Sequence, residues 1–596
     1  MDLKLMAAVP TASERAAVDT FLDRLAGGPG VTGLPRHLLL PALHALVDDV
    51  GWVSEGGLNH VCERLGVPPA EAFAVASFYA LLSTKPLAPV VVHACDDIAC
   101  RMAGAGEVVA GLEARLGPAG GAEGVTWLPS PCVGACDGAP AAFVQRTGAA
   151  NATVDSLAGG AALAGLLSDL RDGGPLRSGR VRMPQVEDGA GGLRLLRRVG
   201  RIDPARLDDY RAAGGYEALR RAIELGPAAV VREVTDSRLL GRGGAAFPAG
   251  RKWAAVAAAT ATPHHLVCNA DESEPGTFKD RALMEEDPYA LVESMTIAGF
   301  ATGCETGYLY VRGEYPVATT RLEHAIGQAR AAGLLGRDVM GAGFDFDVEI
   351  RRGGGAYICG EETALFNSIE GFRGEPRNKP PYPTDQGLFG KPTVVNNVET
   401  LINVLDIVLD GGRAYAAIGT AGSTGTKLFC LSGEVARPGL YEVPFGTTLG
   451  EILDLAGTTG EGVARAILLG GAAGTFVPPD RLDLPLTFED TRAAGASIGS
   501  GVVMVFGEAT DMDDIALRIA AFFRDESCGQ CVPCRVGTVR QQEALERLVA
   551  GGDEGELLDE IGRAMGDASI CGLGHTAALA VRSALELGLL GNGDRR

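Results

Sequence analysis

Residues 12 to 85 carry apolar side chains at intervals of three and four, the spacing of helices that each bury one face. The stretches 13–25, 38–47 and 71–79 follow this spacing most clearly. Helices this short are marginal alone and are stabilised by packing their apolar faces together. The pattern therefore predicts a small helical bundle over residues 12–87.

From Val90 the pattern changes to short apolar runs separated by helix-like stretches. The strand-like runs are 90–94, 125–128 and 141–144, and the helix-like stretches are 107–116 and 163–170. This alternation predicts a compact α/β unit over residues 88–172. Residues 173–202 contain several glycines and arginines and are predicted to form a linker.

The rest of the chain shows three further patterns. Residues 203–420 alternate strand-like runs with glycine-rich polar loops, which predicts a large α/β domain of Rossmann-like type. Residues 421–510 alternate in the manner of strands around one helix, which predicts a β-grasp-like, soluble-ligand-binding domain. Residues 511–596 read as helices around a cysteine loop. The predicted fold class is multidomain α/β.

The composition is that of a globular protein, with 46% hydrophobic and 21% charged residues. No run of about 18 apolar residues occurs, and the first ten residues lack the features of an export signal. A net charge of −22 argues against binding nucleic acid, which requires clustered Lys and Arg. We therefore expect a cytoplasmic protein without direct membrane insertion.

The first candidate metal centre lies near the carboxy terminus. Cys528, Cys531 and Cys534 are separated by two residues each, and Cys571 follows at a distance. Three thiols in close succession plus one remote thiol are typical of a [4Fe–4S] cluster. A structural zinc site is the alternative, although zinc sites usually consist of two paired knuckles.

A second set of four thiols lies in the first α/β unit. Cys95 and Cys100 form one pair and Cys132 and Cys136 another, each directly after a strand-like run. Two separated pairs suit a [2Fe–2S] cluster, which takes two thiolates on each iron. The alternatives are a zinc knuckle and inert buried thiols. Neighbouring acidic residues such as Asp97 favour a cationic metal.

A glycine-rich segment runs from Gly241 to Trp253 and formally contains a dinucleotide fingerprint. The preceding stretch, 232–238, is too polar for the central strand that this motif requires. We interpret the segment as a cradle for a phosphate or a flavin ring, with Arg242 and Lys252 adding charge. A glycine-rich surface turn is the alternative.

Three further polar loops favour the ligand cradle over the surface turn. They are 269–276, directly after a strand-like run, the glycine loop 352–363, and 391–400. Ligand sites of α/β domains form where loops follow the strands of the sheet. Together these loops are suited to hold a flavin and a nicotinamide.

Two long motifs make a family recognisable, Gly-Ala-Tyr-Ile-Cys-Gly-Glu-Glu-Thr-Ala-Leu at 355–365 and Glu-Ser-Cys-Gly-Gln-Cys-Val-Pro-Cys-Arg-Val-Gly-Thr at 526–538. The chain resembles a fusion of two hydrophilic subunits of respiratory complex I. Residues 12–172 resemble the thioredoxin-like [2Fe–2S] subunit, and residues 203–590 resemble the NADH-binding flavoprotein subunit with FMN and a [4Fe–4S] cluster. The chain also resembles diaphorase subunits of NAD-linked hydrogenases and formate dehydrogenases.

The resemblance implies positions for both nucleotides. FMN is expected at Gly241, Arg242, Gly243, Gly244, Lys252, Asn269, Asp271, Glu272, Tyr357, Gly360, Glu361, Asn396, Asn397 and Thr400. NADH is expected at Phe247, Glu274, Glu362, Lys379 and Tyr382. Three residues depart from the usual pattern: Ala255 is small, Tyr382 replaces a phenylalanine, and Ala246 replaces a glycine, which we read as a small steric change.

The resemblance implies an NADH dehydrogenase or diaphorase module, in which Glu274 and Glu362 position the nucleotide and FMN performs the chemistry. Hydride would pass between NAD(H) and FMN, and single electrons through the [4Fe–4S] cluster to other redox subunits. The [2Fe–2S] centre would store an electron or serve a partner. The alternatives are a non-catalytic electron-wiring subunit and a flavin-based bifurcating subunit. Quinone, hydrogen and formate all stay open as the terminal reactant.

Other conspicuous residues have simpler interpretations. Cys62, Cys268, Cys304, Cys359 and Cys430 are expected to be buried core thiols. His93 and His575 lie beside cluster cysteines but are expected to be solvated or packed. The basic stretch 194–201 is expected to be a solvated linker face or a docking surface for an acidic partner.

Overall fold

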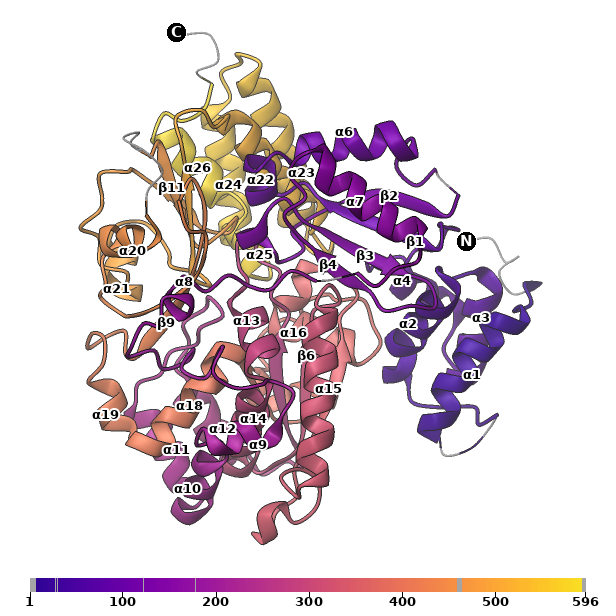
Figure 1. Ribbon diagram of the computed structural model, residues 1–596, viewed down its shortest axis with the longest axis vertical. Coiled ribbons are helices and arrows are strands. Elements are labelled where there is room, and N and C mark those ends of the chain that lie inside the picture. Colours follow the sequence, from indigo (N-terminus) through magenta and orange to yellow (C-terminus); the bar gives the residue numbers. More distant parts are fainter. Residues whose placement is uncertain are drawn as a thin grey trace.

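The computed structural model of the protein describes residues 7–26, 28, 30–121, 123–176, 178–457 and 464–591. Figure 1 shows a multidomain α/β chain whose carboxy-terminal helices lie beside the first α/β unit, above the large central domain. The amino-terminal helices form a separate lobe at one side of this view. Four of these helices pack as the predicted bundle: α1 (Ala12–Ala26), α2 (Leu39–Val50), α3 (Glu55–Leu65) and α4 (Pro69–Ala76).

The first α/β unit is built on a four-stranded sheet in the order β2-β1-β3-β4. Its elements are β1 (Val90–Cys95), α5 (Ile98–Met102), α6 (Ala105–Leu116), β2 (Val125–Ser130), β3 (Ala142–Arg146), β4 (Ala152–Val154) and α7 (Gly160–Arg171). Strands β1 and β2 are parallel, while β3 runs antiparallel to both of its neighbours. Cys95 is the last residue of β1 and Cys100 lies in α5, while Cys132 and Cys136 follow β2.

The central domain holds a four-stranded, fully parallel sheet in the order β7-β6-β5-β8. Its strands are β5 (His264–Ala270), β6 (Cys304–Val311), β7 (Asp347–Arg352) and β8 (Thr393–Asn397). Its helices are α9 (Leu207–Ala212), α10 (Glu217–Leu225), α11 (Pro227–Asp236), α12 (Ala249–Ala257), α13 (Lys279–Glu286), α14 (Pro288–Thr302), α15 (Pro316–Ala331), α16 (Glu362–Ile369), α17 (Pro383–Gln386), α18 (Val398–Asp410) and α19 (Gly412–Ala416).

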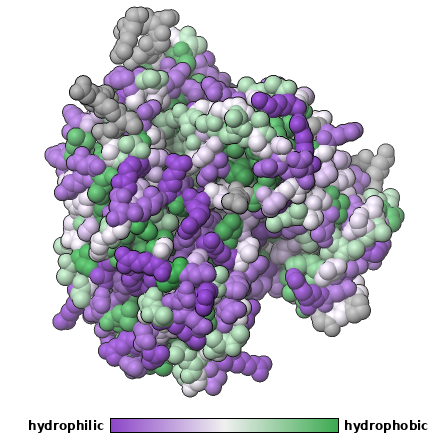
Figure 2. Space-filling view, viewed as in Figure 1, coloured by the Kyte–Doolittle hydropathy of each residue, from purple (hydrophilic) through white to green (hydrophobic). Residues whose placement is uncertain are grey.

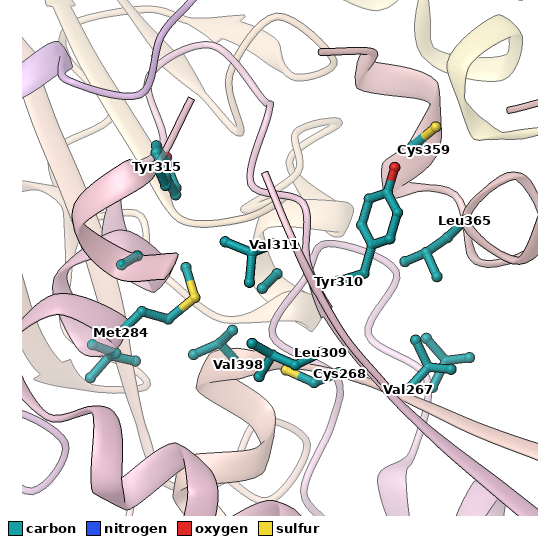
Figure 3. Packing of buried hydrophobic residues seen from close by; sticks show 14 of the residues in the cluster. Val267, Cys268, Met284, Leu309, Tyr310, Val311, Tyr315, Cys359, Leu365 and Val398 are labelled. Carbon is teal, nitrogen blue, oxygen red and sulfur yellow. The ribbon is translucent and has the colours of Figure 1, made fainter. Parts of the chain in front are cut away.

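The packing of this sheet fixes where its polar loops meet. Val267, Cys268 and Leu309 are fully buried between the helices, and Figure 3 shows them at the centre of the core. Because all four strands are parallel, the loops that follow them leave from one edge of the sheet. Helix α11, rather than a strand, precedes the glycine segment at Gly241, so the segment is not a Rossmann fingerprint.

The next unit is a five-stranded sheet in the order β10-β9-β13-β11-β12. Its elements are β9 (Thr426–Gly433), β10 (Gly439–Pro444), α20 (Leu449–Ala456), β11 (Ala466–Leu469), β12 (Thr475–Val477), α21 (Phe488–Ala493) and β13 (Val502–Phe506). The chain then continues in the helices α22 (Met512–Asp525), α23 (Val532–Val549), α24 (Gly555–Ala568), α25 (Gly572–Thr576) and α26 (Leu579–Glu586).

The basic stretch in the linker is docked on the chain itself, which corrects the expectation of a solvated face or a partner surface. Arg198 is buried and its Nε lies 2.8 Å from Asp287 Oδ2. Arg194 Nε lies 2.8 Å from Asp406 Oδ2. The Glu442 carboxylate of β10 accepts hydrogen bonds from the amides of residues 194–196. The linker, which includes the short helix α8 (Pro184–Glu187), is therefore docked on both the central domain and the β-grasp-like unit.

The surface is mixed in character. On the face shown in Figure 2, hydrophilic and hydrophobic residues are interspersed over every unit. Among the described residues, no helix is both long and apolar enough to cross a membrane.

Candidate active site

A cavity of about 370 Å³ lies at the edge of the central sheet where the strand-following loops meet. Ten of the predicted FMN and NADH residues line it: Gly243, Gly244, Asn269, Asp271, Glu272, Glu274, Tyr357, Gly360, Glu361 and Asn397. Three of the lining segments lie at the carboxyl end of β5, at the carboxyl end of β8 and in the loop that follows β7. The volume is within the range of about 300–1,000 Å³ that is usual for ligand pockets.

Three neighbouring carboxyl groups in the cavity have raised pKa values because they are buried. Burial raises the pKa of Asp271 to about 8 and that of Glu272 to about 8. Burial also raises the pKa of Glu274 to about 7, although hydrogen bonds from Tyr357 and the Ala473 amide work in the opposite direction. Near neutral pH the cavity therefore carries less negative charge than three ionised carboxylates would give it.

Glu274 is held from two sides. Tyr357 Oη donates a hydrogen bond of 2.6 Å to Glu274 Oε2, and the Ala473 amide donates one of 2.9 Å to Oε1. Ala473 belongs to the turn between β11 and β12, so the β-grasp-like unit closes the cavity over this carboxyl group. Glu274 is thus fixed in orientation, which suits a positioning role.

A buried charge network lies beside the cavity. The Lys279 ammonium group contacts Asp280, Asn397 and Glu399 at 2.7, 3.2 and 3.1 Å. Lys427 of β9 lies 2.9 Å from Glu399, and both side chains are fully buried. Burial works to raise the pKa of Glu399, but Lys427 and Lys279 outweigh it and hold that pKa below its ordinary value. The network joins the β-grasp-like unit to the helix that follows β8.

The predicted NADH residues, apart from Glu274, lie outside the cavity lining. Phe247 and Tyr382 are exposed, at 44% and 56%. Lys379 Nζ lies 2.7 Å from Glu362 Oε1, and Lys252 Nζ lies 3.5 Å from Glu362 Oε2. Lys252 Nζ lies 5.7 Å from the centre of the Phe247 ring, and Lys379 donates a hydrogen bond of 2.9 Å to Glu361, which lines the cavity. Exposed aromatic rings and clustered charges suit a nucleotide that stacks and hydrogen-bonds.

Several predicted FMN residues serve the scaffold in this structure. Gly241, Arg242, Lys252, Asn396 and Thr400 do not line the cavity. The Arg242 side chain points to Tyr415 and the Thr424 carbonyl, and its amide donates to Thr400 Oγ1 at 2.8 Å. The Asn396 amide oxygen accepts from the Trp253 indole at 2.8 Å. These residues shape the loops on which the lining residues stand.

Ala246 differs from our expectation of a merely steric change. Its φ is +52°, in the left-handed region that glycine adopts freely and alanine disfavours. The methyl group at this position therefore costs backbone strain, in a loop where the family usually has glycine.

Other lining residues were not predicted individually, although Ala245, Ser273 and Ile358 lie within the predicted loops. These residues are Ala245, Ser273, Thr277, Lys279, Asp280, Ile358, Gly470, Ala473, Ser497, Gly499, Ser500, Gly572, Leu573 and Thr576. Lys279 and Asp280 follow the polar loop 269–276 within a few residues, so a longer reading of that loop would have found them. The lining residues between Gly470 and Ser500 come from the β-grasp-like unit, and no sequence motif around them predicts ligand binding.

The four carboxy-terminal thiols face one small cavity. Cys528, Cys531, Cys534 and Cys571 line it together with Ile358, Pro376, Gln530, Ile570 and Leu573. Cys531 stands at the amino terminus of α23, where the helix dipole favours a negatively charged centre. Ile358 and Leu573 line both this cavity and the larger one. The two cavities therefore share a wall.

The second thiol set is also brought together. Cys132 Sγ and Cys136 Sγ lie 3.3 Å apart, and Cys95 interacts with both Cys100 and Cys132. Arg312, which follows β6, donates to the carbonyls of Cys132 and Glu272. Arg518 of α22 pairs with Asp96 at 3.3 Å. This centre is thus fixed against both the larger cavity and the carboxy-terminal helices.

The residues present fit the expected cofactors. Asp271 Oδ2 is buried in the cavity without a partner, a polar atom that a bound flavin would satisfy. All thirteen cysteines are free thiols. Within the described part of the chain, no three or more His, Cys, Asp or Glu side chains are arranged around a single metal ion.

Four family models match the chain in order. They are described as a thioredoxin-like [2Fe–2S] ferredoxin (residues 32–159), the Nuo51 FMN-binding domain (234–406), an SLBB domain (428–472) and the NADH-ubiquinone oxidoreductase-F iron-sulfur binding region (514–587). The descriptions of these models agree with the predicted FMN, [2Fe–2S] and [4Fe–4S] cofactors, and the ferredoxin match covers part of the amino-terminal helical bundle as well as the first α/β unit.

Similar proteins agree with these models. The chain is 46% identical over 398 residues to an F-type subunit of the NADH-quinone oxidoreductase of Rhizobium meliloti, covering 66% of this chain and 94% of the relative. It is 44% identical over 395 residues to the NADP-reducing hydrogenase subunit HndC of Solidesulfovibrio fructosivorans, covering 65% and 80%. A crystal structure of an NAD+-reducing [NiFe]-hydrogenase in the H2-reduced state contains a similar chain, with a TM-score of 0.80, 34% identity, and coverage of 93% and 92%.

Proposed function

Because the chain belongs to the family of F-type subunits of NADH-quinone oxidoreductase, we propose that it transfers electrons between NAD(H) and partner redox subunits through FMN and iron–sulfur clusters. FMN, when bound, exchanges a hydride with the nicotinamide and single electrons with a cluster. The observation that carries this proposal is the wall of Ile358 and Leu573 shared by the larger cavity and the four-thiol cavity.

The protein's own residues contribute binding and orientation rather than a nucleophile or a general base. Gly243 and Gly244 allow the ligand to approach the backbone, and Asp271 and Glu361 supply polar atoms to the cavity. Glu274 in the cavity, together with Phe247, Tyr382, Lys379 and Glu362 outside its lining, would hold the nicotinamide nucleotide. The four thiols Cys528, Cys531, Cys534 and Cys571 would hold the [4Fe–4S] cluster, and Cys95, Cys100, Cys132 and Cys136 the [2Fe–2S] cluster.

The direct test is reduction of ferricyanide by NADH with the purified chain after reconstitution with FMN, iron and sulfide. We expect flavin retention and turnover with NADH. A chain that retained its clusters but neither bound flavin nor turned over would be an electron-wiring subunit instead. We further propose that the chain acts in the cytoplasm as part of a larger assembly.

Reduction of NAD+ is a second candidate for the physiological direction. The similar chain of the NAD+-reducing [NiFe]-hydrogenase aligns over 93% of this chain. The relatives from NADH-quinone oxidoreductases align over about two thirds. Formation of NADH from H2 and NAD+ by a complex isolated through a tag on this chain would establish that direction.

The affinity for NADH should depend on pH through Glu274. Its pKa is about 7, so the group is mainly neutral at pH 6 and anionic at pH 8. An anion in the cavity repels the negatively charged NADH, so the KM for NADH should rise about three- to tenfold between these pH values. In Glu274→Gln the side chain cannot ionise, so the rise in KM around pH 7 should be lost, and only the weaker rise toward pH 8 from Asp271 and Glu272 should be left.

The measurement is KM for NADH in ferricyanide reduction at pH 6, 7 and 8. Glu323→Gln on the exposed face of α15 is the control and should follow the wild-type curve. The assignment fails if Glu274→Gln retains the wild-type dependence.

A further inference from the structure

The flavin-facing loop between β7 and α16 has few side chains with which to fix its own position. It consists of the glycines 353–355, Ala356, the 3₁₀ turn η5 (Tyr357–Gly360) and Glu361. Its front side lines the larger cavity through Tyr357, Ile358 and Gly360. Glycine-rich backbone is conformationally free, so what lies behind the loop must hold it in place.

The segment behind this loop belongs to the amino-terminal lobe. After α4 the chain runs against the glycines, and the amides of Ala80 and Leu81 donate to the carbonyls of Gly355 and Gly354 at 3.2 and 2.9 Å. A Cβ atom on Gly354 would lie 2.7 Å from Tyr79 Cβ. A glycine at position 354 is thus required for this close approach.

Tyr79 extends this contact into the core of the central domain. Its side chain is buried, and its hydroxyl donates to Ser368 Oγ at 2.8 Å and lies 3.2 Å from the Phe372 carbonyl. Tyr310 Oη of β6 lies 2.8 Å from the same Ser368 Oγ. Tyr79 therefore joins the strand β6 and the helix α16 through one shared hydroxyl.

The thiol of Cys359 completes this buried cluster from inside η5. Burial raises the pKa of Cys359, while hydrogen bonds from Tyr310, Ser368 and Tyr79 act in the opposite direction. Figure 3 shows the Tyr310 hydroxyl pointing toward the Cys359 sulfur. Cys359 lies between Ile358 and Gly360, both of which line the larger cavity. The cluster thus supports the loop directly beneath its flavin-facing atoms.

From this arrangement we propose that Tyr79 is a positioning residue for the flavin site. Tyr79 lies within the segment matched by the [2Fe–2S] ferredoxin model, whereas Tyr310, Cys359 and Ser368 lie within the FMN-binding match. The amino-terminal lobe is then a component of the flavin site as well as a neighbour of the [2Fe–2S] unit. This inference rests on the proposed function, because it concerns how tightly the cavity holds FMN.

The test is the Kd of FMN, from quenching of flavin fluorescence when full-length apo-protein is titrated with FMN. Tyr79→Phe should raise this Kd about tenfold, the equivalent of about 1.4 kcal/mol. Tyr289→Phe is the matched control, because Tyr289 is also buried and its hydroxyl donates to the Ala205 carbonyl at 3.1 Å. The control should lose comparable thermal stability and keep the wild-type Kd.

A second variant keeps the test independent of how well Tyr79→Phe folds. Ser368→Ala removes the shared hydroxyl from the other side and should raise the FMN Kd similarly. In the double variant the effects should be less than multiplicative, since both changes break one cluster. Fully multiplicative effects, or a wild-type Kd in Tyr79→Phe, would overturn the inference. Failure of the wild-type chain to bind FMN would instead overturn the proposed function, and this inference with it.

Discussion

Replacing Cys531 by alanine is expected to stop electron transfer to partner subunits while NADH still reduces the flavin. The other three thiols cannot hold the cluster in its normal form, and flavin and partner then lack their connection. Mutating a residue that only hydrogen-bonds to a metal ligand typically lowers metal affinity or activity by about 10- to 100-fold. Loss of a ligand itself should therefore slow partner reduction by at least about 100-fold. The Cys531 thiol lies in the small cavity and does not line the larger one, so flavin binding should persist.

Two measurements on the isolated complex separate these steps. Anaerobic bleaching of the flavin absorbance by NADH reports the first step and should keep its wild-type amplitude. Electron paramagnetic resonance of the reduced partner clusters reports the second and should lose its NADH-dependent signal. Cys62→Ala removes a buried thiol of the amino-terminal lobe and serves as the control. Normal partner reduction in Cys531→Ala would show that electrons leave by another route.

The sequence predicted the parts of the site whose signal is local. The thiol spacings and the loops at 269–276 and 352–363 are contiguous motifs, and the parallel sheet brings those two loops to one edge. Element order was also readable, because the hydrophobic period changes from helix to strand at Val90 and again in the β-grasp-like unit.

The parts that the sequence did not reveal depend on contacts between distant segments. Arg198 pairs with Asp287 across 89 positions and Arg197 with Asp406 across 209, so a basic stretch that looked solvated is docked. The cavity wall at Gly470 to Ser500 exists only because the β-grasp-like unit packs on the central domain. Likewise, nothing near Tyr79 in the sequence marks it as a neighbour of the flavin loop.

The packing of those two units leads to the second large effect, which is on stability. Glu399 is the shared anion of Lys279 and Lys427, with contacts of 3.1 and 2.9 Å. Glu399→Gln keeps the shape of the side chain but removes the charge, which leaves Lys427 buried without a carboxylate partner. Burial already lowers the pKa of Lys427 to about 8, and the Glu399 charge acts against this shift. Without that charge the Lys427 ammonium group loses its proton more easily. Removing one member of a buried ion pair costs about 3–5 kcal/mol of unfolding free energy.

The isosteric change at Glu399 should therefore lower the free energy of unfolding by about 3 kcal/mol, measured by urea denaturation at pH 7.5. Glu554→Gln, which breaks an exposed pair with Arg547 at 2.7 Å, is the control and should cause no measurable change. The direction in which this stability contribution changes with pH follows from the pKa of Glu399. The pKa of Glu399 is lowered, so its contribution is present above its ordinary pKa of 4.5 and disappears as the pH falls through the lowered value. The wild-type protein should thus lose its advantage over Glu399→Gln as the pH falls into acid, and an advantage that grew with falling pH would place the effect elsewhere than in this charge.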